Sequence, residues 1–304
     1  MKKRAVSSLL ATLAVVSFIL PALATEPFED GETPAQDGAA EAGPESSIIL
    51  DGVPQPIEYE MRNGTTYVTV SSFVSMADPQ AVVEEEDGVV TVSSAVVEEV
   101  VDDEGNTANV VQETLSMTVS AGVPYIVANG RYLYAKANIV MLNDCVAAPV
   151  RTLAKVFNLD VAYDGEAQAV LLTHSETSGA YLQPGDSYYD GDALYWLSRI
   201  IHQESGNQIL DGKIAVGNVV MNRVNSPLFP DNIYDVLTQK NQFSPASTLS
   251  KWTPNSESEL AAKLVLDGAQ VVPNALFFAQ AGLSCYASRY RPYVTTIGGH
   301  AFYA

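Results

Sequence analysis

The sequence predicts an α+β protein with a β-rich N-terminal half and a mainly helical C-terminal part. Three observations support this fold class. Short runs of strand-forming residues dominate residues 47–174. That region also repeats itself. From Asp190 onward the apolar residues follow the period of a helix, and a further helix is expected near residues 256–266. We therefore expect two domains, 47–174 and 190–304, joined by a linker at residues 175–189.

The first 24 residues have the pattern of a secretory signal peptide. A basic start, Met1–Arg4, precedes an apolar run that ends at Pro21, and the small residues Ala22–Ala24 suit a cleavage site. The run is short for a membrane span, and retention as an N-terminal anchor is the less favoured reading. We expect a secreted protein with no membrane span after signal removal. Residues 25–46 are rich in Glu, Gly, Pro and Ala and are predicted to be a disordered linker.

The net charge of −20 is unevenly placed along the chain. Residues 186–304 carry ten acidic and eight basic residues, so residues 1–185 hold a net charge of −18. This excess argues against nucleic-acid partners and against attraction to anionic membranes. Cys145 and Cys285 fall in different halves. A disulfide between them is one interpretation, and two buried free thiols are the favoured one.

Residues 47–174 contain two similar units at an offset of 80 residues. Each unit has the pattern of a strand, a short helix and a strand. The matching positions begin at Asn63-Gly64 in the first unit and at Asn143-Asp144 in the second. They end at Val90–Val92 and Val170–Leu172. We expect the two units to pack together as one small α+β module.

The second unit resembles the copper amine oxidase N-terminal-like domain of secreted bacterial proteins. The resemblance rests on an Asn-Gly hairpin, the segment Pro149–Ala154 and the turn Val161–Asp164, and it covers about residues 117–173. It implies a stalk, spacer or wall-docking role, with contacts to wall or spore-coat proteins; a purely structural role is the alternative. The family name implies no copper here, because His174 is the only histidine of this region.

The helix expected after Asp190 ends in a carboxylate. Its apolar stripe recurs at three- and four-residue steps and consists of Leu194, Leu197, Ile200 and Ile201. Glu204 occupies the next position of the stripe, and Ser205–Asn207 form a helix stop. Burial favours the protonated form of a carboxylate, which a general acid requires near neutral pH. The alternative is that Glu204 is solvated at the end of the helix.

Residues 213–224 are predicted to form a buried helix, because they are apolar on most sides. Ala215 and Gly217 are small enough to let the preceding helix approach closely. Arg223 lies at the C-terminal end of this helix, where a cation is favourable, so we interpret it as structural.

Residues 190–304 resemble the SleB-type cell wall hydrolases, the spore cortex-lytic enzymes. The matching residues occur in family order: His202 and Glu204, Gly212, Ala215-Val216, Asn222–Val224, Phe229-Pro230, Gln242-Phe243, and Ile297-Gly298 through His300 to Tyr303. The resemblance implies a lysozyme-like, transglycosylase-like catalytic domain acting on peptidoglycan glycan strands. It also implies that Glu204 serves first as acid and then as base, which yields a 1,6-anhydro sugar at the bond between N-acetylmuramic acid and N-acetylglucosamine.

Six side chains are candidates for substrate binding. They are Gln242 and Phe243 for a sugar subsite, Tyr286 and Tyr290 in an aromatic loop with Arg289 and Arg291, and His300 and Tyr303 along the cleft. For the tyrosines and for His300, packing in the protein interior is the alternative.

The chain departs from the family pattern four residues after Glu204. Many members carry a second Glu there, whereas this chain has Gln208, which excludes a second acid at that position. Asp211, Asp231 and Asp267 are interpreted as turn or cap residues. We expect no metal and no cofactor, because His202 and Glu204 are two residues apart and point to different faces of a helix.

Two other functions remain open at this stage. Ser205 and Gln208 suggest a non-catalytic peptidoglycan-binding or scaffold protein of the same fold. An amidase that cuts the peptide stem would need zinc or a nucleophilic cysteine. In the favoured reading, the protein is secreted and acts at the cell wall or the spore.

Overall fold

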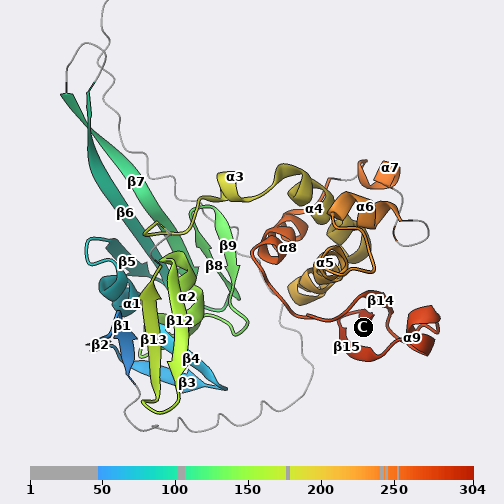
Figure 1. Ribbon diagram of the computed structural model, residues 1–304, viewed down its shortest axis with the longest axis horizontal. Coiled ribbons are helices and arrows are strands. Elements are labelled where there is room, and N and C mark those ends of the chain that lie inside the picture. The colour runs from blue at the N-terminus through green and yellow to red at the C-terminus, as the bar shows by residue number, and fades with distance from the viewer. Residues whose placement is uncertain (1–46, 102–106, 176–178, 240–242, 244–245, 252) are drawn as a thin grey trace, which may run out of the picture. The chain divides into compact units, whose positions relative to one another are not determined.

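The computed structural model describes residues 47–101, 107–175, 179–239, 243, 246–251 and 253–304 (Figure 1). The predicted signal peptide and the linker at residues 25–46 lie outside these residues. The described part is β-rich up to residue 174 and mainly helical from residue 185 to residue 266, so the predicted α+β class is confirmed. No described helix has both the length and the apolar character that crossing a membrane requires.

The described strands of the N-terminal module, residues 47–174, form three sheets. Their strand orders are β12-β13-β1-β2, β10-β11-β4-β3 and β5-β6-β7-β8-β9. The elements are β1 (Ile48–Leu50), β2 (Val53–Gln55), β3 (Tyr59–Arg62), β4 (Thr65–Thr69), α1 (Val70–Ala77), β5 (Val82–Glu86), β6 (Val89–Val101), β7 (Thr107–Ser120), β8 (Tyr125–Ala128), β9 (Arg131–Tyr134), β10 (Val140–Leu142), β11 (Cys145–Pro149), α2 (Val150–Val156), β12 (Leu159–Asp164) and β13 (Ala169–His174).

The internal repeat predicted from the sequence is present in the structure. The β4–α1 segment starts at Thr65, and its counterpart β11–α2 starts 80 residues later at Cys145. The turn before each segment has an asparagine with positive φ, 48° at Asn63 and 49° at Asn143. Asn tolerates this left-handed conformation better than most residues, which explains why both units use it.

The two units join through their equivalent strands. β4 and β11 pair antiparallel, with Val68 opposite Ala148. These two residues are themselves equivalent at the offset of 80, so the pairing is centred on a matched pair. Two like strands that pair antiparallel are related by a two-fold axis when the register is centred in this way. The units therefore meet as pseudo-symmetric partners. The ring centroid of Phe73 in α1 lies 5.8 Å from that of Phe157, which follows α2.

The described part of the predicted linker at residues 175–189 is hydrogen-bonded to the module. The side-chain amide of Asn158 donates to the carbonyl oxygens of Gly179 and Tyr181, both at 2.6 Å. The N–H of Leu182 donates to the carbonyl oxygen of Val156 at 2.9 Å, and the Leu182 side chain belongs to the hydrophobic core of the module. Residues 179–182 are therefore part of the module's packing.

The helical domain has its own hydrophobic core, to which α4 (Gly191–Ser205), α5 (Leu210–Val224) and α8 (Ser256–Leu266) contribute. A Cβ atom on Gly217 would lie 2.8 Å from Val265 Cγ2 and 3.0 Å from Ile201 Cδ1. The close helix approach predicted at Gly217 is therefore confirmed. The remaining elements are α3 (Gly185–Tyr188), α6 (Ile233–Thr238), α7 (Ala246–Leu249), α9 (Tyr286–Tyr290) and an antiparallel sheet of order β14-β16-β15, with β14 (Phe277–Gln280), β15 (Tyr293–Ile297) and β16 (His300–Tyr303).

Candidate active site

Glu204 lies on the last turn of α4 and is half-buried. Leu197, Ile200 and Ile201 of the same helix are fully buried, which confirms the main part of the predicted apolar stripe. Glu204 follows Ile200 by four residues and Ile201 by three, so it continues this face where the helix reaches the surface. This position combines partial burial with access from solvent.

Both ends of α4 are fixed by hydrogen bonds. At the N-terminus, Asp190 Oδ1 accepts the N–H of Ala193 at 2.8 Å. At the C-terminus, the N–H of Gly206 donates to the carbonyl oxygen of His202 at 2.9 Å, and Ser205 Oγ donates to that of Ile201 at 2.7 Å. The helix stop predicted at Ser205–Asn207 is confirmed.

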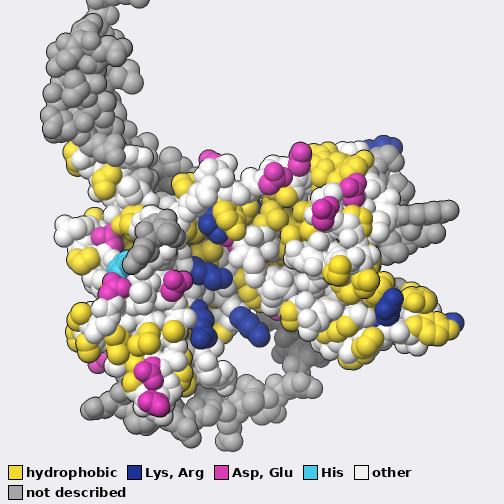
Figure 2. All heavy atoms as spheres, viewed as in Figure 1, with side chains coloured by type: hydrophobic (Ala, Val, Ile, Leu, Met, Phe, Trp, Pro, Cys, Tyr) yellow, Lys and Arg dark blue, Asp and Glu magenta, His cyan; other side chains and the backbone are white. Residues whose placement is uncertain are grey.

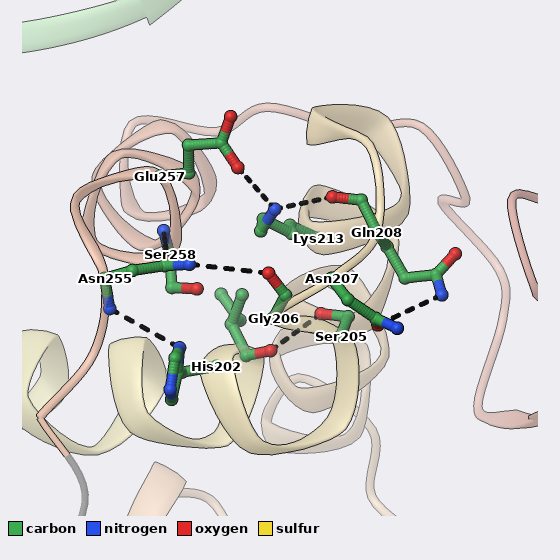
Figure 3. A network of polar contacts seen from close by, with 10 residues as sticks. His202, Ser205, Gly206, Asn207, Gln208, Lys213, Asn255, Glu257 and Ser258 are labelled. Atoms are coloured by element: carbon green, nitrogen blue, oxygen red, sulfur yellow. Dashed lines mark hydrogen bonds and ion pairs between the residues drawn. The ribbon is translucent and has the colours of Figure 1, made fainter.

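A buried lysine holds the turn that follows Glu204 (Figure 3). Lys213 is 1% exposed, and its Nζ donates to the carbonyl oxygen of Gln208 and, at 2.6 Å, to Glu257 Oε2. Since a buried ammonium that lost these acceptors would keep its desolvation cost, the pair ties the turn to α8. This contact was not predicted, because Lys213 lies in a segment whose apolar residues alone indicated a buried helix.

Asn255 connects the start of α8 to the end of α4 (Figure 3). Its Oδ1 caps α8 by accepting the N–H of Ser258 at 2.9 Å. Its backbone N–H donates to His202 Nδ1, and its side-chain amide donates to the carbonyl oxygen of Gly206, each at 3.4 Å. The last turn of α4 is therefore anchored on both sides of Glu204 in the sequence.

Gln208 connects the same turn to the β15–β16 hairpin. Its Oε1 accepts the N–H of Gly299 at 2.7 Å. Gly298 has a φ of +55°, which favours glycine, and a Cβ atom there would collide with Gln208 Oε1, so a larger residue would displace the Gln208 side chain. The side-chain amide of Gln208 thus serves as an acceptor that holds the hairpin next to the end of α4.

His300 directly follows this turn and joins a group of aromatic rings. Its ring meets Phe278 edge-on at 5.3 Å, and Phe278 lies 6.4 Å from Phe243. Burial lowers the pKa of His300, and its Nδ1 is buried with no hydrogen-bond partner among the described residues. Of the predicted substrate residues, His300 therefore adjoins the hairpin turn that Gln208 binds, and Phe243 is connected to His300 through Phe278.

Arg223 occupies the other side of this aromatic group. It is 4% exposed, and its Nε donates to the carbonyl oxygen of Leu276 at 2.7 Å. Its guanidinium lies 4.9 to 5.3 Å from the ring centroids of Phe229, Phe243 and Phe277. These contacts agree with the structural role assigned to Arg223 from the sequence.

Residues 207–303 match the family model described as Cell Wall Hydrolase. The match is confined to the C-terminal part of the chain. The matched segment includes Gln208, Lys213, Arg223 and the β15–β16 hairpin, and it begins three residues after Glu204. The role of Glu204 therefore stays a prediction, as does the N-terminal resemblance.

Several curated proteins that are similar to the chain are named spore cortex-lytic enzymes. The chain is 26% identical over 116 residues to that of Oceanobacillus iheyensis, covering 38% of this chain and 42% of the relative. It is 25% identical over 116 residues to that of Bacillus subtilis, covering 38% of each. The chain spans less than half the length of the relatives it matches.

Two solved structures are also similar to this part of the chain. One is the catalytic domain of the germination-specific lytic transglycosylase SleB from Bacillus anthracis, with 25% identity, a TM-score of 0.36 and coverage of 40% of this chain and all of that one. The other is the SleB catalytic domain of Bacillus cereus, with 24% identity, a TM-score of 0.35 and coverage of 38% of this chain and 92% of that one.

The remaining substrate candidates lie elsewhere. Tyr286 and Tyr290 lie on α9, a short helix where the sequence predicted a loop. Tyr303 lies three residues after His300 on β16, and side chains of a strand alternate between its faces. Its ring is buried and packs with Ala287 and, at 6.0 Å, with Tyr293. The structure thus separates Tyr303 from His300, and Gln242 lies outside the described residues.

The acids considered as partners of Glu204 have other contacts. Asp211 Oδ1 accepts the hydroxyl of Tyr134 at 3.0 Å, and Asp267 caps α8 while it pairs with Arg131. Asp231 is exposed in the loop before α6. Asp231 and Asp267 agree with the turn and cap roles assigned from the sequence. For Asp211 that assignment was wrong, because Asp211 lies inside the first turn of α5.

The described residues contain no group of three or more His, Cys, Asp or Glu side chains that could hold a metal ion. Cys145 and Cys285 are free thiols, each half-buried. A hollow of about 340 Å³ lies at the end of α4, lined by His202, Gln203, Gly206 and Asn207. Glu204 is not among its lining residues, so this hollow opens on a different face of the helix.

Proposed function

We propose that the protein is an exported peptidoglycan hydrolase of the cell envelope that cleaves glycan strands between N-acetylmuramic acid and N-acetylglucosamine. The observation that carries the proposal is the position of Glu204. It is half-buried at the end of α4, next to a turn that Lys213, Asn255 and Gln208 fix by hydrogen bonds. A general acid needs both partial burial and a fixed position.

The reaction proposed is lytic transglycosylation with Glu204 as the single acid and base. The protonated carboxyl donates its proton to the glycosidic oxygen as the bond from that oxygen to C1 of the muramic acid breaks. The resulting carboxylate then accepts the proton of the 6-hydroxyl of the same sugar, whose oxygen attacks C1. The products are a free hydroxyl on the leaving strand and a 1,6-anhydro end, and Glu204 is again protonated. No water is consumed.

One carboxylate suffices for this route, whereas ordinary glycosidases use two. The support from the structure is that Asp211 and Asp267 are engaged with Tyr134 and Arg131, and Gln208 is an amide. His300 and Phe243 are the side chains we propose for contacts to the sugar beside Glu204.

Glu204→Gln tests the proposal, because the amide keeps the shape of the side chain and cannot donate an acidic proton. We expect release of soluble fragments from purified sacculi to fall by at least about 100-fold with an unchanged unfolding midpoint. Glu259→Gln makes the same chemical change at an exposed position of α8 and should retain full activity. Mass spectrometry of the fragments should find ends lighter by one water than reducing ends. Lysis retained by Glu204→Gln would rule out the assigned role.

A non-catalytic wall-binding protein is the second candidate, suggested by the amide at Gln208. It predicts that the native chain binds sacculi and releases no soluble fragments. Release by the native chain that depends on Glu204 excludes it.

A further inference from the structure

The surface around α9 combines exposed tyrosines with arginines. Tyr286, Tyr290 and Tyr293 are 61%, 69% and 62% exposed. The rings of Tyr286 and Tyr290, four residues apart, lie 5.2 Å from each other. Figure 2 shows hydrophobic and basic side chains next to each other in the region where Figure 1 places α9. We call these three tyrosines together with Arg289 and Arg291 the α9 patch.

The charge of this surface differs from that of the rest of the chain. Residues 268–304 contain no Asp or Glu, although the chain has 36 acidic and 16 basic residues. Arg289 and Arg291 are both exposed. Within the described part of the chain neither forms an ion pair: Arg289 donates to Ser284 Oγ at 3.0 Å, and Arg291 lies over the ring of Phe277 at 4.7 Å. Both guanidinium groups can therefore pair with an external anion.

The tyrosines of the patch are not explained by packing in the protein interior. Single exposed apolar side chains are common, and Tyr163 on β12, 52% exposed, is an example. A group of exposed rings bordered by charged side chains is instead typical of a binding surface. The flat rings suit the C–H faces of sugars, and the arginines suit carboxylates.

The α9 patch and the turn after Glu204 are connected by one hairpin. Gly299 in the β15–β16 turn is bound by Gln208, and Tyr293 begins β15 at the other end. At 3.4 Å per residue, the four steps from Tyr293 to Ile297 span about 14 Å. A polymer of linked sugars that is bound at Glu204 can extend over such a distance.

We propose that the α9 patch is a second binding surface for the peptidoglycan strand, separate from the proposed catalytic position at Glu204. The tyrosine rings contact sugar faces, and Arg289 and Arg291 pair with carboxylates of the peptide stems. This inference rests on the proposed function for the identity of the polymer. It adds a way to hold an insoluble substrate while Glu204 acts on one bond.

The test is cosedimentation of the full chain with purified sacculi from which phosphate-bearing polymers have been removed. The Glu204→Gln background keeps the sacculi intact. Two double variants are compared in it, Arg289→Gln with Arg291→Gln and Tyr286→Ser with Tyr290→Ser. We expect each to weaken binding by about tenfold, as two lost exposed contacts predict. The arginine effect should shrink at high salt.

Matched controls lie in the N-terminal module. Arg151→Gln and Tyr163→Ser remove the same groups from exposed positions outside the patch and should leave binding unchanged. Tyr286→Phe with Tyr290→Phe keeps the rings and should retain binding. Amidation of the stem carboxylates on the sacculi should make the arginine double variant and the Glu204→Gln chain bind equally well.

The outcomes separate this inference from the proposed function. Unchanged binding by both double variants overturns the α9 patch, as does binding only to walls that retain phosphate polymers. A third outcome also overturns the α9 patch but leaves the proposed function intact. In it, the native chain lyses sacculi, and the Glu204→Gln chain shows no measurable binding to them. Absence of both lysis and binding overturns the proposed function, and with it the polymer named here.

Discussion

Helix α5 buries a basic residue near each of its ends, and the two ends stabilise their charges differently. Lys213, near the N-terminus, is paired with the carboxylate of Glu257 and donates to a backbone carbonyl. Arg223, near the C-terminus, is surrounded by three phenylalanine rings and donates to the carbonyl oxygen of Leu276. No carboxylate among the described residues pairs with it. Burial lowers the pKa of Arg223 to about 10, which leaves it charged at neutral pH.

This difference separates two tasks in the helical domain. The Lys213 end fixes the turn after Glu204, where a small displacement of the backbone affects the proposed chemistry. At the other end, the Arg223 side chain fills the space between three rings and binds the carbonyl oxygen of Leu276, the residue before β14. We therefore expect changes at Arg223 to act mainly on stability and changes at Lys213 to act mainly on activity.

Arg223→Ala should have the largest effect on stability. It leaves a cavity between Phe229, Phe243 and Phe277 and an unpaired carbonyl at Leu276, and it should cost about 3–5 kcal/mol of unfolding free energy. Arg223→Met keeps most of the volume and should cost about 1–3 kcal/mol, mainly for the carbonyl. Denaturant unfolding of the full chain measures both. Equal losses for Ala and Met would show that the packing against the rings contributes little.

Lys213→Met should separate activity from stability. It leaves the carbonyl oxygen of Gln208 unpaired at a cost of about 1–3 kcal/mol, while Glu257, half exposed, becomes solvated. Because the turn after Glu204 loosens, we expect activity on sacculi to fall by about tenfold or more at temperatures where the variant is folded. The exposed Lys251→Met is the control for loss of charge. Full activity in a destabilised Lys213→Met would limit Lys213 to a structural role.

The fold was predictable where the signal is local. The 3.6-residue period placed the apolar face of α4 and its end at Ser205, and the offset of 80 identified β4–α1 and β11–α2 as equivalents. The pairing of Val68 with Ala148 was not predictable, because a repeat shows which strands are alike and not which edges meet. The β6–β7 hairpin continues to Val101 and Thr107 (Figure 1), well beyond the stretch that repeats.

The site was predictable only in part, for a related reason. Glu204 lies on a periodic helix and stands out in the sequence. Gln208 reaches Gly299 across 91 residues, and no local pattern encodes such a contact. Lys213 was missed because one lysine in an apolar run is usually read as the exposed position. Tyr286–Tyr290 is too short a helix to show a period, so the sequence predicted a loop there.

The smallest expected effect concerns how the free energy of unfolding depends on pH through His300. This histidine belongs to the group of aromatic rings that Arg223 contacts. An unperturbed histidine titrates near pH 6.5, and burial lowers the pKa of His300 in the folded protein. Between the lowered value and about 6.5 the unfolded chain binds more protons at this residue than the folded chain does. The contribution of His300 to stability is therefore fully present above pH 6.5 and is lost as the pH falls through this window. His300→Phe keeps a ring against Phe278 and has no proton to bind. As the pH is lowered from 7 to 5, the unfolding free energy of the native chain should fall relative to that of the variant. If the two plots of unfolding free energy against pH are parallel, burial of His300 has no measurable effect on its protonation.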